Sequence, residues 1–354
     1  MILGDTLLRQ PTRLLPLLAG VAAVSAVAAV LFGGVTLGLA DVAAVFGDWV
    51  GLVESDPVDP AAQAVLEVIR VPRVLLACCV GATLGVGGAV MQALFRNPLA
   101  DPSLIGVSAG AAAAVAVTIV LTEVAGTLLP LPRAWQMPVA AFLGGLVTTA
   151  AVYALAQGNG RTSVAGMLLA GIALNAVASA VVGLMSYLSD DQQLRQLSMW
   201  SMGSLGSAAP GTLTPALTLM LVSTLGGVLL WRPLNLMLLG EAEAFHLGVA
   251  VDRLKAVAVV LVAIGVGASV AAAGPVAFVG LVAPHLVRLL GGSDHRLVLP
   301  GAALLGSAMV CLADLVARTV VLPAEMPVGL VLAGVGGPFF VGLLIVARRR
   351  GDWA

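Results

Sequence analysis

Charged residues are scarce in this sequence, and their scarcity excludes a soluble globular protein. Only 10% of the 354 residues are Asp, Glu, Lys or Arg, whereas soluble domains carry about 25%. Hydrophobic residues make up 60% of the chain, and the mean hydropathy is +1.08. The formal net charge of −1 gives no indication of a nucleic-acid partner, and we expect none. We therefore expect the chain to lie in a lipid bilayer.

The chain also lacks the usual marks of a metal centre, a disulfide framework or an ATPase. Its three cysteines, Cys78, Cys79 and Cys311, all lie in apolar runs and form no Cys-x-x-Cys pair, so we expect small packing residues. No Gly-x-x-x-x-Gly-Lys-Ser/Thr phosphate loop is present, so the chain cannot hydrolyse ATP alone. The sequence predicts no resident cofactor, no metal site and no catalysis by this chain itself.

Long apolar stretches are abundant, and they predict an all-α polytopic membrane protein with about ten transmembrane helices. A helix needs about 20 mainly apolar residues to cross a bilayer. We treat residues 1–354 as a single transmembrane domain. The predicted spans are roughly residues 14–34, 74–95, 104–123, 136–157, 163–187, 211–231, 255–273, 275–290, 299–320 and 327–347, of which the eighth is the shortest.

The distribution of positive charge gives an orientation. An inside N-terminus with ten spans places most of the arginines in the cytoplasm, in agreement with the positive-inside rule. Both termini are then cytoplasmic. Arg9 and Arg13 precede the first span, which we expect to be kept as an anchor rather than cleaved as a signal peptide. Residues 36–70 are expected to form an outer loop with an amphipathic helix, and residues 232–254 the longest cytoplasmic segment.

One predicted span combines glycines with a polar side chain. Gly81, Gly85 and Gly88 are three or four residues apart, a spacing that lets helices approach closely. Gln92 lies within the same span and Asn97 at the following turn. Polar groups at such positions usually face the bundle interior or a pathway. Helix packing alone would explain the glycines but not these two polar residues.

Five motifs in order along the chain resemble the permeases that import iron-siderophores, haem and vitamin B12, the FecCD-type family of ABC importers. They extend from residue 70 to residue 340, which makes coincidence a poor explanation. The motifs are Arg70-Val71-Pro72-Arg73 with residues 96–111, residues 240–249, residues 274–288, Asp294-His295-Arg296 with Asp314 and Arg318, and residues 325–329 with Gly337-Pro338-Phe339-Phe340.

The resemblance implies a fold like that of the vitamin B12 permease and a particular assembly. Two copies of the chain would form a homodimer with one pathway at the two-fold axis. Two cytoplasmic ABC ATPase subunits would bind ATP and magnesium, and an extracytoplasmic binding protein would deliver the substrate. The complex would lie in a bacterial inner membrane, and the chain would be its multi-pass permease subunit.

The resemblance also implies roles for three sets of residues. Residues 240–249 match the loop that contacts the ATPase, and Arg70, Arg73 and Arg318 match arginines that pair with glutamates of the binding protein. Asn97, Leu99, Thr162 and Ser163 match segments that narrow the pathway on the cytoplasmic side. Each set has a plainer interpretation, namely an interfacial helix, snorkelling arginines or helix caps. The coupling candidates are Gly240, Glu241, Ala244, Leu247 and Gly248, and the pathway or gate candidates are Gln92, Asn97, Leu99, Thr162 and Ser163.

The segment between the fifth and sixth spans favours haem as the substrate. Residues 190–195 are most similar to the haem permeases of the family, and Arg195 from two protomers would suit two propionates. Arg195 can equally pair with Asp190 or Asp191. Met199 offers a soft sulfur, although methionine mostly serves as adaptable packing. A ferric siderophore or cobalamin is the alternative substrate.

An ion-coupled secondary transporter is the alternative from another class. It needs an ionisable residue near the middle of the membrane, and Asp314 is the available candidate. Arg318 follows four residues later and can pair with Asp314, which weighs against this alternative. We expect His246, His285 and His295 to make structural hydrogen bonds rather than to ligate iron.

Overall fold

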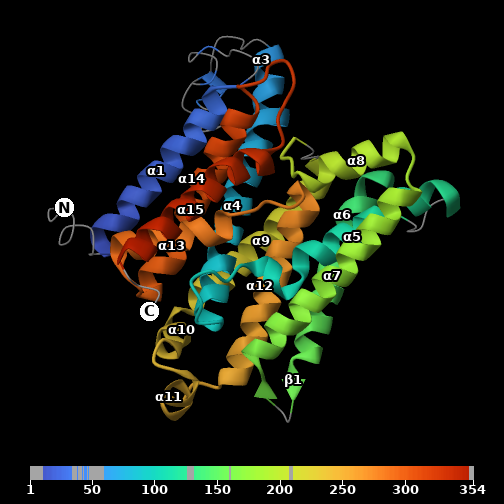
Figure 1. The fold of residues 1–354 in the computed structure, drawn as a ribbon. Coiled ribbons are helices and arrows are strands. Elements are labelled where there is room, and N and C mark those ends of the chain that lie inside the picture. Colours follow the sequence, from blue (N-terminus) through green and yellow to red (C-terminus); the bar gives the residue numbers. More distant parts are fainter. Residues whose placement is uncertain are drawn as a thin grey trace.

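The computed structural model describes residues 11–33, 38, 42, 44, 45, 47, 60–125, 131–158, 161–206 and 210–350, and most of these are helical. Figure 1 shows the long helices side by side in one bundle. Helix α1 begins and α15 ends at the side of the bundle remote from α3. This arrangement agrees with an even number of spans.

Each predicted span overlaps one long helix of the described chain, so the prediction of an all-α membrane protein is confirmed. Six helices can cross a membrane by length and composition, α9 and α10 form a pair bent by 52°, and three further apolar helices are shorter. The long helices are α1 (Pro11–Leu31), α4 (Val71–Leu94), α5 (Val107–Ala125), α6 (Arg133–Leu155), α7 (Val164–Leu188), α9 (Pro210–Leu229), α12 (Val251–Ala273), α13 (Val279–Gly291), α14 (His295–Ala317) and α15 (Val328–Arg350).

The second span begins earlier than predicted, at Val65 rather than near residue 74. Helix α3 (Pro60–Ala64) and the π-helical turn η1 (Val65–Arg70) lead directly into α4, so the second candidate span already begins at Val65. Residues 61–70 contain neither glycine nor proline and favour a helix. Most of residues 36–59 lie outside the described part of the chain.

Short elements lie at the two ends of the bundle. The amphipathic helix α8 (Asp191–Ser201) lies at one end, which we name the α8 end. Helices α10 (Trp231–Met237) and α11 (Glu241–His246) lie at the other, the α11 end, together with the hairpin of β1 (Gln157–Gly158) and β2 (Arg161–Thr162). The short helix η2 (Pro102–Ile105) precedes α5.

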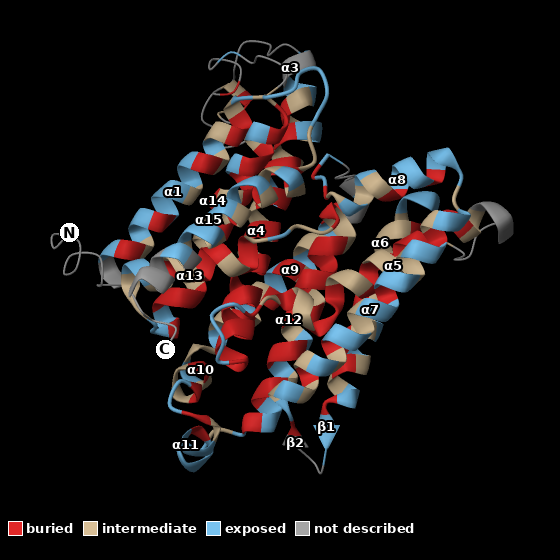
Figure 2. Cartoon of the chain, viewed as in Figure 1, coloured by how far each residue is buried: buried red, intermediate tan, exposed pale blue. Residues whose placement is uncertain are grey.

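Helix α4 is the centre of the bundle because its glycines admit the backbones of neighbouring helices. Figure 2 shows it as mostly buried, and 78% of its span window is buried. A Cβ added at Gly81 or Gly85 would overlap backbone atoms of α14, and one at Gly88 would overlap backbone atoms of α13. The close packing predicted from the glycine spacing is therefore confirmed.

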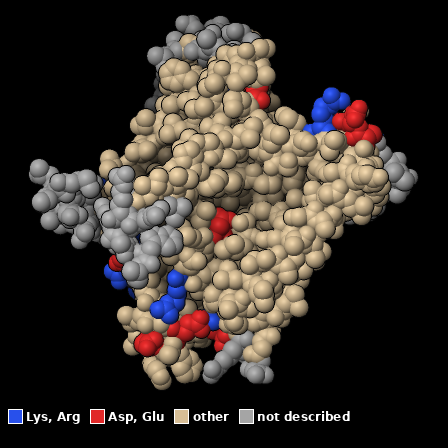
Figure 3. Space-filling model, viewed as in Figure 1, with Lys and Arg blue, Asp and Glu red and all other residues tan. Residues whose placement is uncertain are grey.

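Charged side chains gather towards the ends of the molecule. Figure 3 shows a face whose middle is almost free of them, apart from an acidic group in a central hollow. Acidic and basic groups lie near α8 and again near α10 and α11. Such a distribution suits a bundle with an apolar belt in contact with lipid.

Candidate functional site

Two glycines define the limits of α11 at the α11 end. Gly240 has φ 126° and Gly248 has φ 89°, conformations that residues with a Cβ rarely adopt. Between them Ala244 is fully buried, whereas Leu247 is 57% exposed. Phe245, which the sequence did not single out, is 67% exposed. The short helix therefore packs one small residue inward and presents two large apolar side chains outward, as a contact surface for a partner would.

Glu241 lies on the same helix but turns towards the bundle. Its Oε2 is 2.7 Å from Nζ of Lys255, and Lys255 is only 2% exposed. The same Nζ donates a hydrogen bond of 2.9 Å to the carbonyl of Thr162. A coupling candidate and a gate candidate, which are far apart in the sequence, are thus joined by one lysine.

Lys255 and Asp252 are the residues at this end that the sequence reasoning missed. Asp252 Oδ1 accepts a hydrogen bond of 3.0 Å from the backbone N–H of Thr162, whose hydroxyl donates to Tyr153 at 3.1 Å. A signal was available, because Lys255 is the only lysine of the chain and is followed at once by the apolar run of α12. Such a residue needs a partner when it is buried.

Ser163 and Asn97, two of the gate candidates, make hydrogen bonds to backbone groups close to them in the sequence. Ser163 is the N-cap of α7 and accepts a hydrogen bond of 3.1 Å from the N–H of Gly166. Asn97 Oδ1 accepts from the N–H of Leu99 at 2.9 Å, and the Leu99 side chain is 49% exposed. The capping alternative is confirmed for Ser163. A gating role for these residues stays a prediction.

Gln92 faces the interior of the protomer. It is 3% exposed, and its Nε2 donates to the carbonyl of Gly280 at 3.3 Å. Its Oε1 accepts a hydrogen bond from Arg288 of α13. Gln92 therefore joins α4 to α13, which satisfies its amide in an otherwise apolar core.

The three docking candidates are buried near the α8 end. Arg73 pairs with Asp314 at 2.8 Å and with Glu325 at 2.9 Å, and Arg318 pairs with Asp314 at 3.4 Å. Arg70 donates to the carbonyls of Val30 and Leu31 at the end of α1. All three arginines are 3–5% exposed, so they link α1, α4 and α14 within the protomer. Docking to a binding protein stays a prediction.

Asp314 has no exposed surface and lies between two arginines. The pairing with Arg318 that the sequence suggested is present, and Arg73 is a second, shorter partner. The ionisable residue that a secondary transporter would require is therefore already neutralised by its neighbours.

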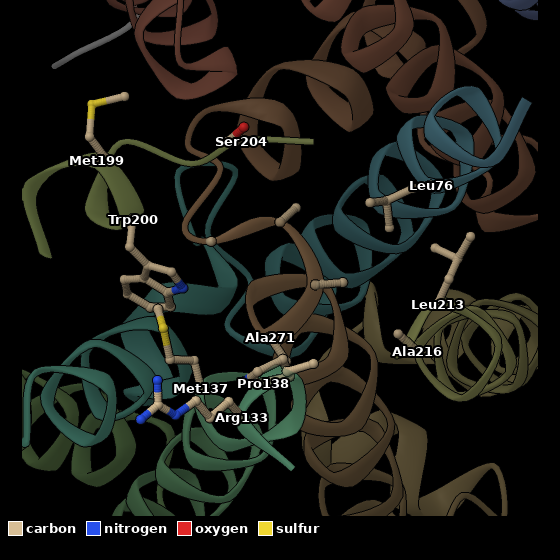
Figure 4. A pocket seen from close by; sticks show the side chains of 14 residues that line it. Leu76, Arg133, Met137, Pro138, Met199, Trp200, Ser204, Leu213, Ala216 and Ala271 are labelled. Atoms are coloured by element: carbon tan, nitrogen blue, oxygen red, sulfur yellow. The ribbon is translucent and has the colours of Figure 1, made fainter. Parts of the chain in front are cut away.

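The haem candidates Arg195 and Met199 both lie on α8 but not in one site. Met199 lines a cavity of about 460 Å³ together with Arg133, Met137 and Trp200. In Figure 4 the side chains of Arg133, Met137 and Trp200 lie close together, and that of Met199 points away from them. Arg195 is exposed and does not line this cavity. Within the described residues no ion pair joins Arg195 to Asp190 or Asp191. Instead, Asp190 caps α8 by accepting hydrogen bonds from the backbone N–H groups of Gln192 and Gln193.

Histidine and acidic side chains near the α11 end serve packing and capping. The backbone N–H and Nδ1 of His295 both lie 2.8 Å from Oδ1 of Asn235. Partial burial alone would raise the pKa of Asp294, but hydrogen bonds from Asn235 and from the N–H of Arg296 outweigh it, so this pKa lies below its ordinary value. Among the described residues, no three His, Cys, Asp or Glu side chains form a group that could hold a metal ion.

Known proteins match this chain over most of its length. The FecCD transport family matches residues 21–346. The hemin transport system permease protein of Yersinia pestis is 50% identical over 282 residues, which cover 80% of this chain and 83% of that protein. The cobalamin import system permease protein of Halobacterium salinarum is 39% identical, over 81% of this chain and 75% of that protein.

A vitamin B12 permease and a solved structure extend the comparison. The vitamin B12 import system permease protein of Escherichia coli O9:H4 is 41% identical over 86% of this chain and 88% of that protein. A metal-chelate type ABC transporter, solved in an inward-facing conformation, is 30% identical with a TM-score of 0.80, over 94% of this chain and 99% of that one. The predicted resemblance and the vitamin B12 permease-like fold are confirmed, and the chain belongs to the FecCD transport family.

Proposed function

We propose that this chain is the permease subunit of an ABC importer that moves haem into the cytoplasm. The observation that carries the proposal is the 50% identity to a hemin permease, against 39–42% for the cobalamin and vitamin B12 permeases. The haem-like segment at residues 190–195 supports the same substrate. Arg195 rather than Met199 is our candidate for contact with the propionates, because its guanidinium is exposed at the α8 end and can pair with carboxylates.

The orientation follows from the two ends of the bundle. The α11 end faces the cytoplasm in this proposal, with both chain termini on that side. Leu247 and Phe245, which are exposed on α11, then contact an ATPase subunit, and the power for transport comes from ATP and magnesium bound there. The α8 end faces outward, where a binding protein delivers haem.

Two copies of the chain would enclose the pathway. Helices α7 and α15 carry large exposed apolar residues along their lengths, among them Leu169 and Ile172 on α7 and Val335 on α15. A second copy or lipid must cover such faces. On the outer side the binding protein would dock near Arg70, Arg73 and Arg318, and its carboxylates would compete with Glu325, the exposed partner of Arg73. Asn97, Leu99, Thr162 and Ser163 would narrow the inner end of the pathway.

The test is uptake by the complete complex. The chain, its ATPase and its binding protein are reconstituted in liposomes, and ATP-dependent uptake of haem is measured in competition with a ferric siderophore and cobalamin. We expect haem uptake, a marked reduction in Arg195→Ala and recovery in Arg195→Lys. Transport of only a siderophore or cobalamin would overturn the haem assignment, and transport driven by an ion gradient alone would overturn the importer.

A further inference from the structure

We propose that Lys255 is a positioning residue that carries movement of α11 to the inner end of α7. The inference rests on the proposed function, because it assigns to α11 the contact with the ATPase. It goes beyond that function in naming the path by which this contact reaches the membrane helices. The path runs from Glu241 on α11 through Lys255 to Thr162, and from Thr162 along the chain into α7.

The first observation is the state of Lys255 itself. It is the only lysine in the chain, it lies in the first turns of α12, and it is 2% exposed. Its Nζ contacts Glu241 Oε2 at 2.7 Å and the carbonyl oxygen of Thr162 at 2.9 Å. One ammonium group therefore holds two segments from different parts of the sequence.

The second observation is how the segment that receives the contact is held. Thr162 ends β2, which pairs with β1 in the register Gln157↔Thr162. Its backbone N–H is bound to Asp252, so both polar groups of its backbone are held by α12. The next residue, Ser163, caps α7. A displacement of Thr162 therefore acts directly on the first turn of α7.

The third observation is the space around the lysine. A hollow of about 820 Å³ is lined by the hairpin on one side and by α11 on the other. Glu241, Lys255 and Thr162 all belong to its lining. The side chain of Lys255 reaches both sides, so it spans a gap that leaves the two segments room to move.

Burial makes this link mechanically strong. A buried ammonium group that loses its counterion is left without compensation, and breaking such a pair costs several kcal/mol. Glu241 is less buried than its partner, with 43% of its side chain exposed against 3% for Lys255. Because separation would leave the buried ammonium group without its carboxylate, we expect Glu241 and Lys255 to stay paired when α11 moves with the ATPase.

The test compares ATP hydrolysis with uptake in the reconstituted complex. We expect Lys255→Met and Glu241→Gln to hydrolyse ATP at a rate comparable to the wild type but to lower uptake by about tenfold, a typical size for coupling between sites. Lys255→Arg, which keeps the charge, is expected to restore most of the uptake. Arg253→Met is the matched control, because Arg253 is an exposed cation two residues away, and its uptake should not change.

A distance measurement covers the case in which a variant assembles poorly. Spin labels at Gly158 on the hairpin and Ala242 on α11, in a background without the three native cysteines, report the separation of the two segments. We expect this separation to stay constant between nucleotide-free and ATP-bound complexes of the wild type and to change in Glu241→Gln. A separation that changes equally in both proteins would overturn the inference.

The outcomes for the two proposals can be told apart. The wild-type complex alone decides which substrate is transported and whether ATP drives it. If that substrate proves to be another chelate, the same variants are assayed with it. Full coupling of uptake to hydrolysis in Lys255→Met would overturn the role of Lys255 and leave the importer intact.

Discussion

Single buried residues explain how an apolar bundle tolerates charge. Asp314 is completely enclosed, and two arginines from different helices supply its counter-charges. At the opposite end Lys255 is also a buried charge, and Glu241 supplies its counter-charge. In both places the ion pairs join separate helices. Because a charge-assisted pair requires a defined geometry, it fixes the relative position of the two helices more narrowly than an apolar contact would.

The Asp314 cluster gives a prediction on stability. Asp314→Asn leaves Arg73 and Arg318 without the carboxylate that neutralises both, and we expect it to lower the free energy of unfolding by about 3–5 kcal/mol. Unfolding in detergent mixtures measures this change. Glu325→Gln is the control, because Glu325 is half exposed and Arg73 keeps Asp314 as its counterion, so the loss should be about 0–1 kcal/mol. Equal losses in the two variants would contradict the interpretation.

The partners of these residues show which contacts the sequence predicts and which it does not. The pairing of Asp314 with Arg318 was predictable, because residues four apart lie on one face of a helix. The shorter pair with Arg73 joins residues 241 positions apart. Lys255 likewise reaches Glu241 and the carbonyl of Thr162 only because the fold brings these segments together. No spacing rule relates such positions. For the same reason, the arginines expected at an exposed docking surface were found in buried contacts.

Among the elements, length and composition decided which could be predicted. All ten long helices carry an apolar signal that is independent of their neighbours. Helix α8 was missed because it is short and polar, although Asp190 and Gln193 form a capping box that marks its start. The start of the second span at Val65, in η1, was missed because the segment before α4 is only moderately apolar. Turns and surface helices depend on local capping more than on hydropathy.

The contact between α4 and α14 gives a prediction at this scale. Gly81→Ala places a methyl group against the backbone of Gly306, and we expect the overlap to cost about 1–3 kcal/mol of stability. Gly87→Ala is the matched control on the same helix. Its new methyl would meet Val266 at an ordinary 3.4 Å, and alanine favours a helix over glycine by about 0.5–1 kcal/mol.

Thermal unfolding of the two purified variants in one detergent measures the difference. A lower midpoint for Gly81→Ala with an unchanged or higher midpoint for Gly87→Ala is the expected result. If both variants shifted alike, helix propensity rather than interhelical distance would govern the position, and α4 could not owe its central place to its glycines.

For the whole molecule, the two ends differ in what they offer a partner. The α11 end presents Phe245 and Leu247, large apolar side chains at a helix that the ion pair of Glu241 with Lys255 holds to the bundle. The α8 end carries the polar surface of α8 and, at the ends of α4 and α14, the buried arginines. A soluble partner that must transmit force to the bundle needs an apolar contact surface. A partner that only delivers a substrate needs polar contacts that orient it and then let it dissociate. In the proposed assembly, the α11 end therefore suits the ATPase and the α8 end the binding protein.

This assignment predicts which end a reagent reaches first. In a background without Cys78, Cys79 and Cys311, single cysteines are placed at Leu247 on α11 and at Gln192 on α8, both of which are exposed. In cells that make the permease without its ATPase, which would otherwise cover Leu247, a maleimide that cannot cross the membrane is expected to label Gln192→Cys in intact spheroplasts and Leu247→Cys only after permeabilisation. The reverse pattern would place α11 outside the cell, where no ATP is available, and would remove the basis for coupling through Lys255.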